Sequence, residues 1–397
     1  MSILGLLVLF YAGYLFLKGN HATHYNHVKL HPKKQPPHIA VLIAARDESR
    51  VIEGLLRSLK AQTVPLRPED VYVIVETMED PTVKICEKYH NSVIVRRHPA
   101  NRQRKGYALD EAVKQILAAN KHYDLYFVFD ADNVVDKHYM SEMLTNYYQG
   151  YEIATGYRNS KNGNTNVIAA VSSLTFSMIN VMSNRRRAEH GSNIIFSGTG
   201  FYVVGDLVEE WRGWPFHSLT EDYEMSLYAT LHGISTYYNE NAIFYDEQPT
   251  KYRQTVKQRI RWIRGYFSAR QKYIPLMRAR KRGANYGSIV KECIGVRPAI
   301  WAIIGVLLIM IGVVIELVAL SQAQQIWWLL LIILAGIYIV LVLITLEMVK
   351  RERYHFSRAM KLKAIFFNPI YLVTYIPCAI VALLKHNVTW DRIEHGK

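Results

Sequence analysis

Apolar residues follow two patterns along this chain, and the change from one to the other divides it into regions. Long apolar blocks occupy residues 2–17, about 298–320, 326–347 and 365–384. Such blocks approach the roughly 20 apolar residues that an α-helix needs to cross a bilayer. Residues 38–250 instead carry short apolar runs between polar positions, as a folded domain does. We therefore predict an N-terminal transmembrane anchor at 1–20, a folded domain at 38–250, amphipathic interfacial helices at 251–297, three transmembrane spans within 298–385 and a short tail at 386–397.

The folded domain alternates two kinds of segment. Short continuous apolar runs predict buried strands, and segments with apolar residues at helical spacing predict helices. This alternation predicts an α/β fold with a mostly parallel sheet and helices on both faces. The strands are expected at 38–45, 70–76, 91–97 and 124–129, and the helices at 48–62, 82–90 and 106–122. A further apolar segment, 167–183, contains Ser and Asn and is predicted to be a helix of this domain or one lying on the membrane.

The chain is strongly basic, with a formal net charge of +15. Lys and Arg cluster beside the apolar blocks, at 278–282 and 350–363, which indicates membrane lipids as partners. The sequence has no zinc-finger or RNA-recognition spacing, so we expect no nucleic-acid partner. Basic residues such as Lys18 and Lys29 follow the first apolar block, and the positive-inside rule then places the domain in the cytoplasm. The alternative for residues 2–17 is a buried helix of the domain.

The last apolar block and the cysteines bear on topology and compartment. Pro369 and Pro377 predict a kinked or re-entrant third span, which leaves the side of the C-terminus open. Cys86, Cys293 and Cys378 are far apart and form neither a disulfide framework nor a metal quartet. Widely spaced free cysteines fit a reducing compartment. We expect an integral protein of a bacterial-type plasma membrane with its domain inside the cell.

The stretch "FDADN" places Asp130 and Asp132 at the end of the fourth predicted strand. In parallel sheets, ligands bind beyond the carboxyl ends of the strands. Carboxylates gathered at one such edge repel each other unless a cation lies among them, and their oxygens are suitable ligands for a divalent metal. The other strand-end acids are Asp47, Glu48, Glu76 and Asp80, and the nearby cations are Arg102, Arg104 and Lys105. The edge therefore predicts a site for a metal and a diphosphate; the alternative is a pair of solvated turn aspartates.

Three further motifs follow in order. "SGTGFYV" at 197–203 has two glycines around a hydroxyl residue, which lets the backbone approach a ligand. "LTEDYEMS" places Glu221 and Asp222 before a helix-like stretch. "QRIRW" presents Gln258, Arg261 and Trp262 on one face of an amphipathic helix, where an arginine could bind a diphosphate and a tryptophan could stack on a sugar ring. The alternative for this helix is a purely interfacial one with snorkelling arginines.

Asp-x-Asp, a glycine-containing loop, Thr-Glu-Asp and Gln-x-x-Arg-Trp, in this order and between apolar blocks, resemble the membrane-bound family 2 glycosyltransferases. That family includes synthases of cellulose, chitin, hyaluronan and poly-N-acetylglucosamine. The resemblance covers roughly residues 38–275. It implies a GT-A-type nucleotide-sugar-binding domain, one transmembrane segment before it and three after it. The chain departs from the family after the second strand, where "VETMED" has Glu76 in place of a common Asp-Asp pair.

The resemblance also implies a role for each matched residue. Asp222 would be the general base beside Glu221, Asp132 would ligate Mg²⁺ or Mn²⁺, and Asp130 would contact both the nucleotide sugar and the metal. The donor nucleotide would be held by Asp47, Glu48, Glu76, Lys105, Asp130, Gln258, Arg261 and Trp262. The acceptor would be held by Ser197, Gly198, Thr199, Gly200 and Trp262.

These roles predict an inverting, metal-dependent transfer of a sugar from a UDP-sugar donor to a hydroxyl, giving a β-linkage. Gln-x-x-Arg-Trp favours a processive polysaccharide synthase that extrudes a glycan between its spans. Four spans are few for a channel, which favours either a homo-oligomer or accessory subunit, or a single transfer to a lipid acceptor. A scaffold with a decayed transferase domain is a third alternative, against which the intact acidic motifs argue.

Overall fold

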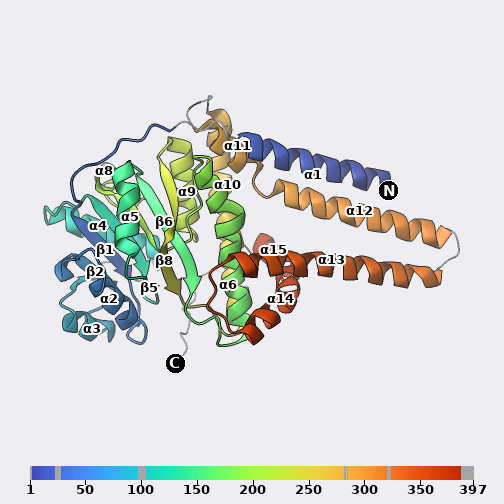
Figure 1. Cartoon of the computed structure of the whole chain (residues 1–397). Coiled ribbons are helices and arrows are strands. Elements are labelled where there is room, and N and C mark those ends of the chain that lie inside the picture. The colour runs from blue at the N-terminus through green and yellow to red at the C-terminus, as the bar shows by residue number, and fades with distance from the viewer. Residues whose placement is uncertain are drawn as a thin grey trace.

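The computed structural model describes residues 2–22, 28–96, 104–280, 283, 285–319 and 323–385 (Figure 1). A twisted eight-stranded sheet forms the centre of one lobe, with the strand order β3-β2-β1-β4-β7-β6-β8-β5. Helices cover both faces of this sheet, and long helices extend from one side of it (Figure 1). The predicted tail at 386–397 and the predicted ligand Arg102 lie outside the described residues.

The first half of the sheet is parallel, as the sequence predicts. Its strands are β1 (Ile39–Ala44), β2 (Val71–Val75), β3 (Ser92–Val95) and β4 (Leu125–Asp130). The connections contain α2 (Ile52–Lys60), a 3₁₀ turn at Pro68–Asp70, α3 (Thr82–Lys88) and α4 (Lys105–Ala118). Val41, Leu42 and Phe127 are completely buried, which is why these strands are apolar on both faces.

The second half of the sheet is mixed, and the apolar pattern did not predict it. β7 (Phe201–Val204) runs antiparallel to β4 and to β6 (Ile153–Ser160), while β8 (Thr236–Asp246) is parallel to β6 and pairs with β5 (Val134–Val135). The helices of this half are α5 (Tyr139–Gln149), α6 (Val167–Ile179), a π-helix at Asn180–Asn184, α7 (Arg185–Glu189), α8 (Gly205–Trp211) and α9 (Glu221–His232). α6 is the apolar segment that we expected to be a helix, and it packs on β6.

Further helices lie outside the sheet lobe. They are α10 (Tyr252–Ala279), α11 (Tyr286–Ile294), α12 (Arg297–Ala319) and α13 (Ala323–Arg351), together with the N-terminal α1 (Ser2–Ala22). Among them, α1, α12 and α13 are long and apolar, and they point away from the sheet (Figure 1). Within the described residues, three segments have the length and composition to cross a membrane: Ile3–Ala22, Leu330–Arg351 and Arg358–Leu384. α12 contributes a shorter apolar stretch, Ile300–Glu316.

α1 and α12 lie side by side because small residues allow them to approach closely. A Cβ atom added to Gly5 would lie 2.7 Å from the carbonyl oxygen of Gly305. Contacts between small residues are the usual way in which apolar helices associate where no water drives them together. The first and second apolar blocks are therefore packed as a pair.

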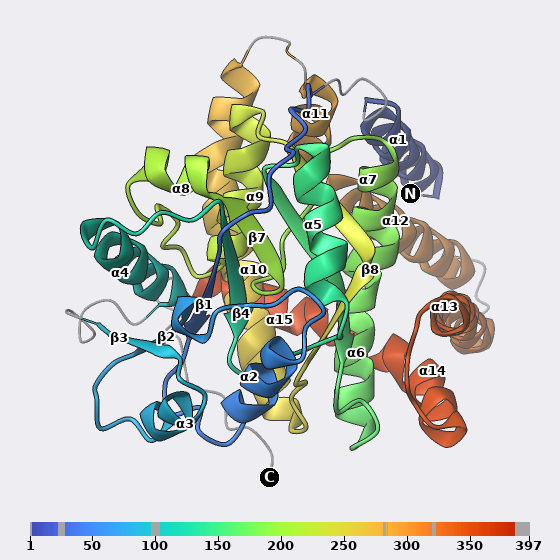
Figure 2. The same cartoon turned by 60° about the vertical axis from the view of Figure 1, so that its left-hand side comes forward.

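The third C-terminal block is broken into two helices, α14 (Arg358–Val373) and α15 (Tyr375–Leu384). The break falls at Thr374, between the two prolines that predict a kink. The pair does not run alongside α12. α14 packs on α6 and on α13, and α15 packs on α10 (Figures 1 and 2).

The end of α13 is hydrogen-bonded into the sheet lobe. The Tyr157 hydroxyl donates to Glu352 Oε2 at 2.7 Å, and Asn159 Nδ2 donates to the Arg353 carbonyl at 2.7 Å. Arg185 forms an ion pair with the fully buried Glu352 carboxylate, 3.1 Å away, and another with Glu240. Part of the basic stretch 350–363 is thus built into the folded domain.

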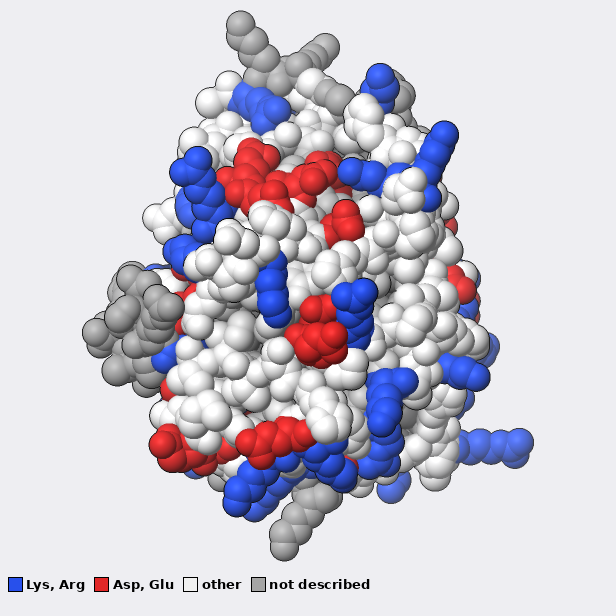
Figure 3. Space-filling model, turned by 90° about the vertical axis from the view of Figure 1, so that its left-hand side faces the viewer, with Lys and Arg blue, Asp and Glu red and all other residues white. Residues whose placement is uncertain are grey.

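Charged side chains of both signs occur on the face that carries α2, α3 and α4. Figure 3 shows Lys and Arg next to Asp and Glu over this face rather than one continuous basic surface. Lys88 pairs with Glu53 at 2.7 Å, and Lys114 pairs with Asp110 at 2.8 Å. The positive charge of the chain is therefore partly balanced here by local pairs.

The buried Glu352 carboxylate predicts a test of how the lobe and α13 are joined. Glu352→Ala leaves the Tyr157 hydroxyl and one side of Arg185 without an acceptor, so we expect unfolding to become easier by about 1–3 kcal/mol. Thermal unfolding of the purified chain should show this as a lower midpoint. Glu347→Ala is the matched control, because Glu347 is exposed and its one ion pair within the described residues is with Arg351, one turn away. Equal midpoints for the two variants would contradict the assignment.

Candidate active site

Lys105 links the end of β4 to the glycine-containing loop at 197–200. It is the first residue of α4, and its ammonium group donates to Asp130 Oδ1 at 2.5 Å and to the Gly198 carbonyl at 2.7 Å. Asp130 ends β4, and its side chain is 40% exposed, whereas that of Lys105 is 16% exposed. A half-exposed carboxylate at a strand end and a largely buried cation thus share one hydrogen-bonded site.

Gly106 explains why a glycine follows this lysine. A Cβ atom at Gly106 would lie 1.9 Å from the Phe216 carbonyl oxygen, so only glycine lets α4 begin here. Arg104 donates to the adjacent His217 carbonyl at 3.0 Å. The exposed Arg104, which was expected to face the diphosphate, thereby also anchors the loop before α9.

The loop of residues 197–200 is shaped by its glycines. Gly198 and Gly200 have φ values of +87° and +63°, in the left-handed region that favours glycine. A Cβ atom at Gly200 would also lie 2.3 Å from the ring of Phe244. The loop therefore requires both glycines for its backbone conformation.

Thr199 stabilises the strand end and does not face a ligand. It is completely buried; its hydroxyl accepts the Asp130 backbone N–H at 2.8 Å and donates to the Asn133 side chain. Gly200 is also buried. Direct acceptor contact, which the sequence predicted for all four loop residues, fits only the partly exposed Ser197 and Gly198.

Glu221 and Asp222 begin α9 beside this loop. Asp222 Oδ1 accepts the Tyr223 backbone N–H at 2.8 Å. Asp222 Oδ2 lies 3.5 Å from the position that a Cβ atom would take on Gly198. Gly198 thus lies between the predicted base and the lysine that binds Asp130.

The pKa values of the Glu221 and Asp222 carboxyls are set by burial, which raises them, and by nearby positive charges, which lower them. Burial raises the pKa of the Asp222 carboxyl, while the Tyr223 N–H and the charges of Lys105 and Arg261 act to lower it. Burial, followed by the charge of Asp222, raises the pKa of the Glu221 carboxyl. A carboxylate with a raised pKa is better able to accept a proton near neutral pH.

α10 brings the Gln-x-x-Arg-Trp segment to the same place. Gln258, Arg261 and Trp262 are all partly exposed on this helix. A Cβ atom on Gly265 would lie 2.5 Å from the Thr220 side chain, so α10 packs closely against the start of α9. The Trp262 ring meets the Phe176 ring of α6 edge to face, with centroids 5.5 Å apart.

Arg158 is a site residue that the sequence analysis missed. It lies on β6, where its Nε donates to Asp246 Oδ2 at 2.8 Å and its Nη1 donates to the Ser197 carbonyl at 2.5 Å. Its guanidinium lies 3.6 Å from the centroid of Phe176, and its charge lowers the pKa of Asp222. Arg158 belongs to no sequence motif, and its strand β6 was not predicted. Its place in the site is therefore visible only in the folded structure.

The strand-end acids at the predicted nucleotide end differ from one another. Asp47 is exposed with φ +54°, and its N–H donates to Asp80 Oδ2 at 2.8 Å. Asp80 is buried, so it holds this loop rather than facing the crevice. Glu48 is partly exposed, and its N–H donates to Thr82 Oγ1 at 3.0 Å. Glu76 is paired with Arg46 at 3.2 Å and, at 3.7 Å, with Arg96, which makes this corner less acidic than the sequence suggests.

The residues at the end of β4 suit a hard divalent cation with few protein ligands. Asp132 is partly exposed two residues after Asp130, and its Oδ1 accepts the Asn133 amide at 3.2 Å. Among the described residues, no cluster of three or more His, Cys, Asp or Glu side chains could enclose a metal. Two carboxylates with open positions fit a metal whose other ligands come from a diphosphate and water.

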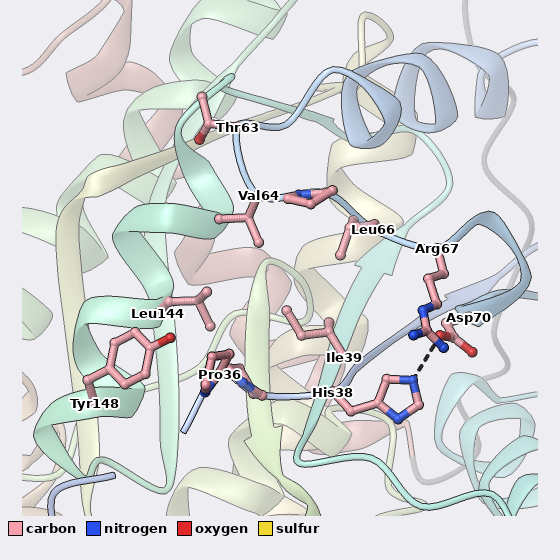
Figure 4. Close-up of a pocket in the computed structure, with 12 residues that line it drawn as sticks. Pro36, His38, Ile39, Thr63, Val64, Leu66, Arg67, Asp70, Leu144 and Tyr148 are labelled. Atoms are coloured by element: carbon pink, nitrogen blue, oxygen red, sulfur yellow. Dashed lines mark hydrogen bonds and ion pairs between the residues drawn. The ribbon is translucent and has the colours of Figure 1, made fainter. Parts of the chain in front are cut away.

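A separate hollow of about 670 Å³ lies at the opposite edge of the sheet (Figure 4). It is lined by the segment before β1, including Pro36 and His38, and by Val64, Leu66 and Leu144. His38 Nε2 lies 3.1 Å from Asp70 Oδ2. The amino ends of the parallel strands form this edge, so the hollow is distinct from the acids at the carboxyl ends.

Comparison with known proteins defines the class of the fold. The solved structure of the mannosyltransferase PcManGT from Pyrobaculum calidifontis, in complex with GDP-Man and Mn²⁺, superposes with a TM-score of 0.59. The match covers 96% of this chain and 97% of that one at 14% sequence identity, so it concerns the fold alone. The fold is that of the GT-A-like glycosyltransferases.

The sequence then identifies the family. Residues 36–265 match the family described as "Glycosyltransferase like family 2", and the chain belongs to it. It is 26% identical over 249 residues to a probable glycosyltransferase, YdaM, of Bacillus subtilis, covering 58% of this chain and 56% of that protein. It is 24% identical over 230 residues to the poly-β-1,6-N-acetyl-D-glucosamine synthase of Staphylococcus aureus, covering 57% and 54%. The matches span about half the length of these curated relatives.

The close contact at Gly106 predicts that a substitution there lowers stability and nucleotide affinity. Substitution of Gly54 serves as the control. Gly106→Ala places a methyl group against a backbone carbonyl and should displace Lys105, with destabilisation of about 1–3 kcal/mol and weaker binding of a nucleoside diphosphate. Gly54→Ala, in the first turn of α2, meets only Val134 at an ordinary 3.5 Å and should be neutral or mildly stabilising. Thermal unfolding and fluorescent-nucleotide titration of both variants check this. Equal behaviour of the two would refute the role given to the close approach.

Proposed function

We propose that this protein transfers a sugar from a UDP-sugar to a hydroxyl acceptor with inversion at the anomeric carbon. One chain of contacts supports this best: Asp130 binds Lys105, Lys105 binds Gly198, and Gly198 lies against Asp222. The strand end that would hold the donor is thereby placed next to a carboxylate that could serve as base. A single displacement from an α-linked donor yields a β-linkage.

The residues divide into a leaving-group side and an attacking side. Lys105 and Arg261 would stabilise negative charge on the departing diphosphate through charge-assisted hydrogen bonds. Asp222 would take the proton of the acceptor hydroxyl, for which burial has already raised its pKa. Ser197, Gly198 and Trp262 would orient the acceptor, and Asp47, Glu48 and Glu76 the nucleotide. Mg²⁺ or Mn²⁺ held by Asp130 and Asp132 would supply Lewis-acid neutralisation of the diphosphate.

We propose further that the chain is a membrane-bound polysaccharide synthase with its catalytic domain at 38–250 in the cytoplasm. The three apolar segments, the basic residues that follow the first of them and the Gln-x-x-Arg-Trp segment on α10 support this. The similarity to a poly-β-1,6-N-acetyl-D-glucosamine synthase supports a glycan acceptor and product.

One observation favours a second candidate, the addition of a single sugar to a membrane lipid. Only 6% of the most apolar window in Leu330–Arg351 is buried within the described structure, so the other described helices cover little of α13. A lipid acceptor reaches the site along the membrane surface and needs no channel. Extrusion of a polymer would instead require a second copy or an accessory subunit to complete a path.

A donor screen separates the two candidates. Membranes containing the chain are incubated with radiolabelled UDP-glucose, UDP-N-acetylglucosamine or UDP-glucuronate and Mg²⁺ or Mn²⁺, with GDP-mannose in a parallel reaction. Label in a polymer supports the synthase, and label in a lipid of one added sugar supports the second candidate. Transfer from GDP-mannose alone would correct the nucleotide, and no transfer from any donor would overturn the proposal.

Removal of the proposed base predicts a selective loss. Asp222→Asn should lower kcat by roughly 10²–10⁴-fold, the usual contribution of a general base, and leave UDP affinity nearly unchanged. In the unaltered protein, transfer should increase as pH rises through the Asp222 pKa, because only the ionised form accepts a proton. Burial raises that pKa, so the midpoint should lie above that of an ordinary aspartate. Full activity of Asp222→Asn would exclude this residue as base.

The metal assignment predicts a shift in metal dependence. Asp132→Asn should raise the Mn²⁺ concentration for half-maximal transfer by roughly tenfold or more. Asp206→Asn is the control, since Asp206 is 85% exposed on α8 and, among the described residues, pairs with Lys33 alone. Transfer is measured against Mn²⁺ concentration after chelation. An undiminished rate in chelator would refute metal dependence.

A further inference from the structure

Arg259 is a buried cation that forms no ion pair with a carboxylate among the described residues. It lies on α10 between Gln258 and Arg261, and its side chain is completely inaccessible to solvent. None of the ion pairs between described residues involves it. A buried charge without a partner is strongly destabilising, so its surroundings must replace both the water and the counter-ion.

Those surroundings belong to the break between α14 and α15. Arg259 Nη1 donates to the Thr374 hydroxyl at 2.6 Å and, at 3.5 Å, to the Tyr371 carbonyl. Thr374 separates the two helices, and Tyr371 is in the last turn of α14. The unpaired carbonyls of a helix C-terminus carry partial negative charge, so they stabilise a cation there.

Aromatic rings and the backbone of α10 complete the environment. The guanidinium carbon lies 4.4 Å from the ring centroid of Tyr371 and 4.8 Å from that of Tyr375. Cation–π contacts of this kind become stronger away from water. Thr255, one turn back on α10, accepts from Arg259 Nε through its carbonyl at 3.2 Å and from Nη2 through its hydroxyl at 3.3 Å.

The same two tyrosines reach α6, which carries the ring against Trp262. The Tyr371 hydroxyl lies 3.1 Å from the Ser172 hydroxyl, and the Tyr375 hydroxyl donates to Thr175 at 3.5 Å. Phe176 is the next residue on α6 and contacts Trp262. The tyrosines beside Arg259 are therefore hydrogen-bonded to the helix whose Phe176 ring packs on Trp262.

We infer that Arg259 is a positioning residue that locks α10 onto the helix pair α14–α15 and so fixes where Arg261 and Trp262 lie in the active site. Its side chain is buried against the break between α14 and α15, away from the partly exposed face of α10. Lysine cannot replace it, because a single ammonium lacks the planar fork that reaches Thr374 and Thr255 together. This inference rests on the proposed function for its catalytic consequence, but the coupling of the helices is measurable without any turnover.

The test compares full-length variants in detergent or bilayer discs. Arg259→Lys should lower kcat/KM for the donor by roughly ten- to a hundredfold, the scale of loss from a small misplacement, while the metal concentration for half-maximal transfer stays unchanged. Thr374→Val removes the shorter hydrogen bond at nearly constant volume and should cause a smaller loss. The double variant should lose less than the product of the two single losses, because both act on one contact.

A control isolates the contact from the rest of α10. Arg253→Gln removes an exposed charge on the same helix and should retain donor kcat/KM within about twofold. A loss in Arg259→Lys and Thr374→Val that appears only as a lower unfolding temperature, with donor kcat/KM within twofold at a temperature where both are folded, would overturn the inference.

A second measurement separates this inference from the proposed function. Amide hydrogen exchange at 258–262 and at 370–376 should rise together in Arg259→Lys and remain unchanged in Arg253→Gln. This pattern in a chain that transfers no sugar would leave the helix coupling standing and refute the function. Unchanged exchange in both segments of an active chain would refute the coupling alone.

Discussion

The site depends on one ammonium group that serves two acceptors. Lys105 binds the Asp130 carboxylate and the Gly198 carbonyl, which belong to segments almost seventy residues apart in the chain. Because its side chain is largely buried, neither contact is fully screened by water, and each would leave an unpaired polar group if broken. Gly106 and Arg104 hold the start of α4, so the lysine is presented from a fixed point. The strand end, the glycine loop and the carboxylates of α9 are arranged around this group.

The parallel half of the fold could be predicted from the sequence, and the other half could not. β1 to β4 are continuous apolar runs because they are buried on both faces, and a run of this kind stands out in any sequence. β6 and β8 alternate or mix polar residues such as Asn159 and Asn239, whose amides bind neighbouring segments instead of solvent. Their partners are distant in the chain, so no local pattern reveals them.

The candidate site shows the same division. Asp130, Asp222 and Arg261 stand in short ordered motifs, and the structure brings them close enough for Lys105 and Arg261 to act on one carboxyl group. Thr199 and Asp80 look like ligand contacts in the sequence but satisfy backbone N–H groups at strand ends. Arg158 and Arg259 belong to no pattern that could be separated from surface charge, because what distinguishes them is burial, which depends on tertiary packing.

The hydrogen bonds from β6 to the end of α13 also set the geometry of the lobe relative to any bilayer that holds α13. Tyr157 and Asn159 bind Glu352 and Arg353 directly, without an intervening linker. A lobe attached in this way cannot swing or retreat on a tether; its height above the lipid follows from the depth of the helix. Under the proposed function, an acceptor anchored in that lipid would meet the site at one fixed level.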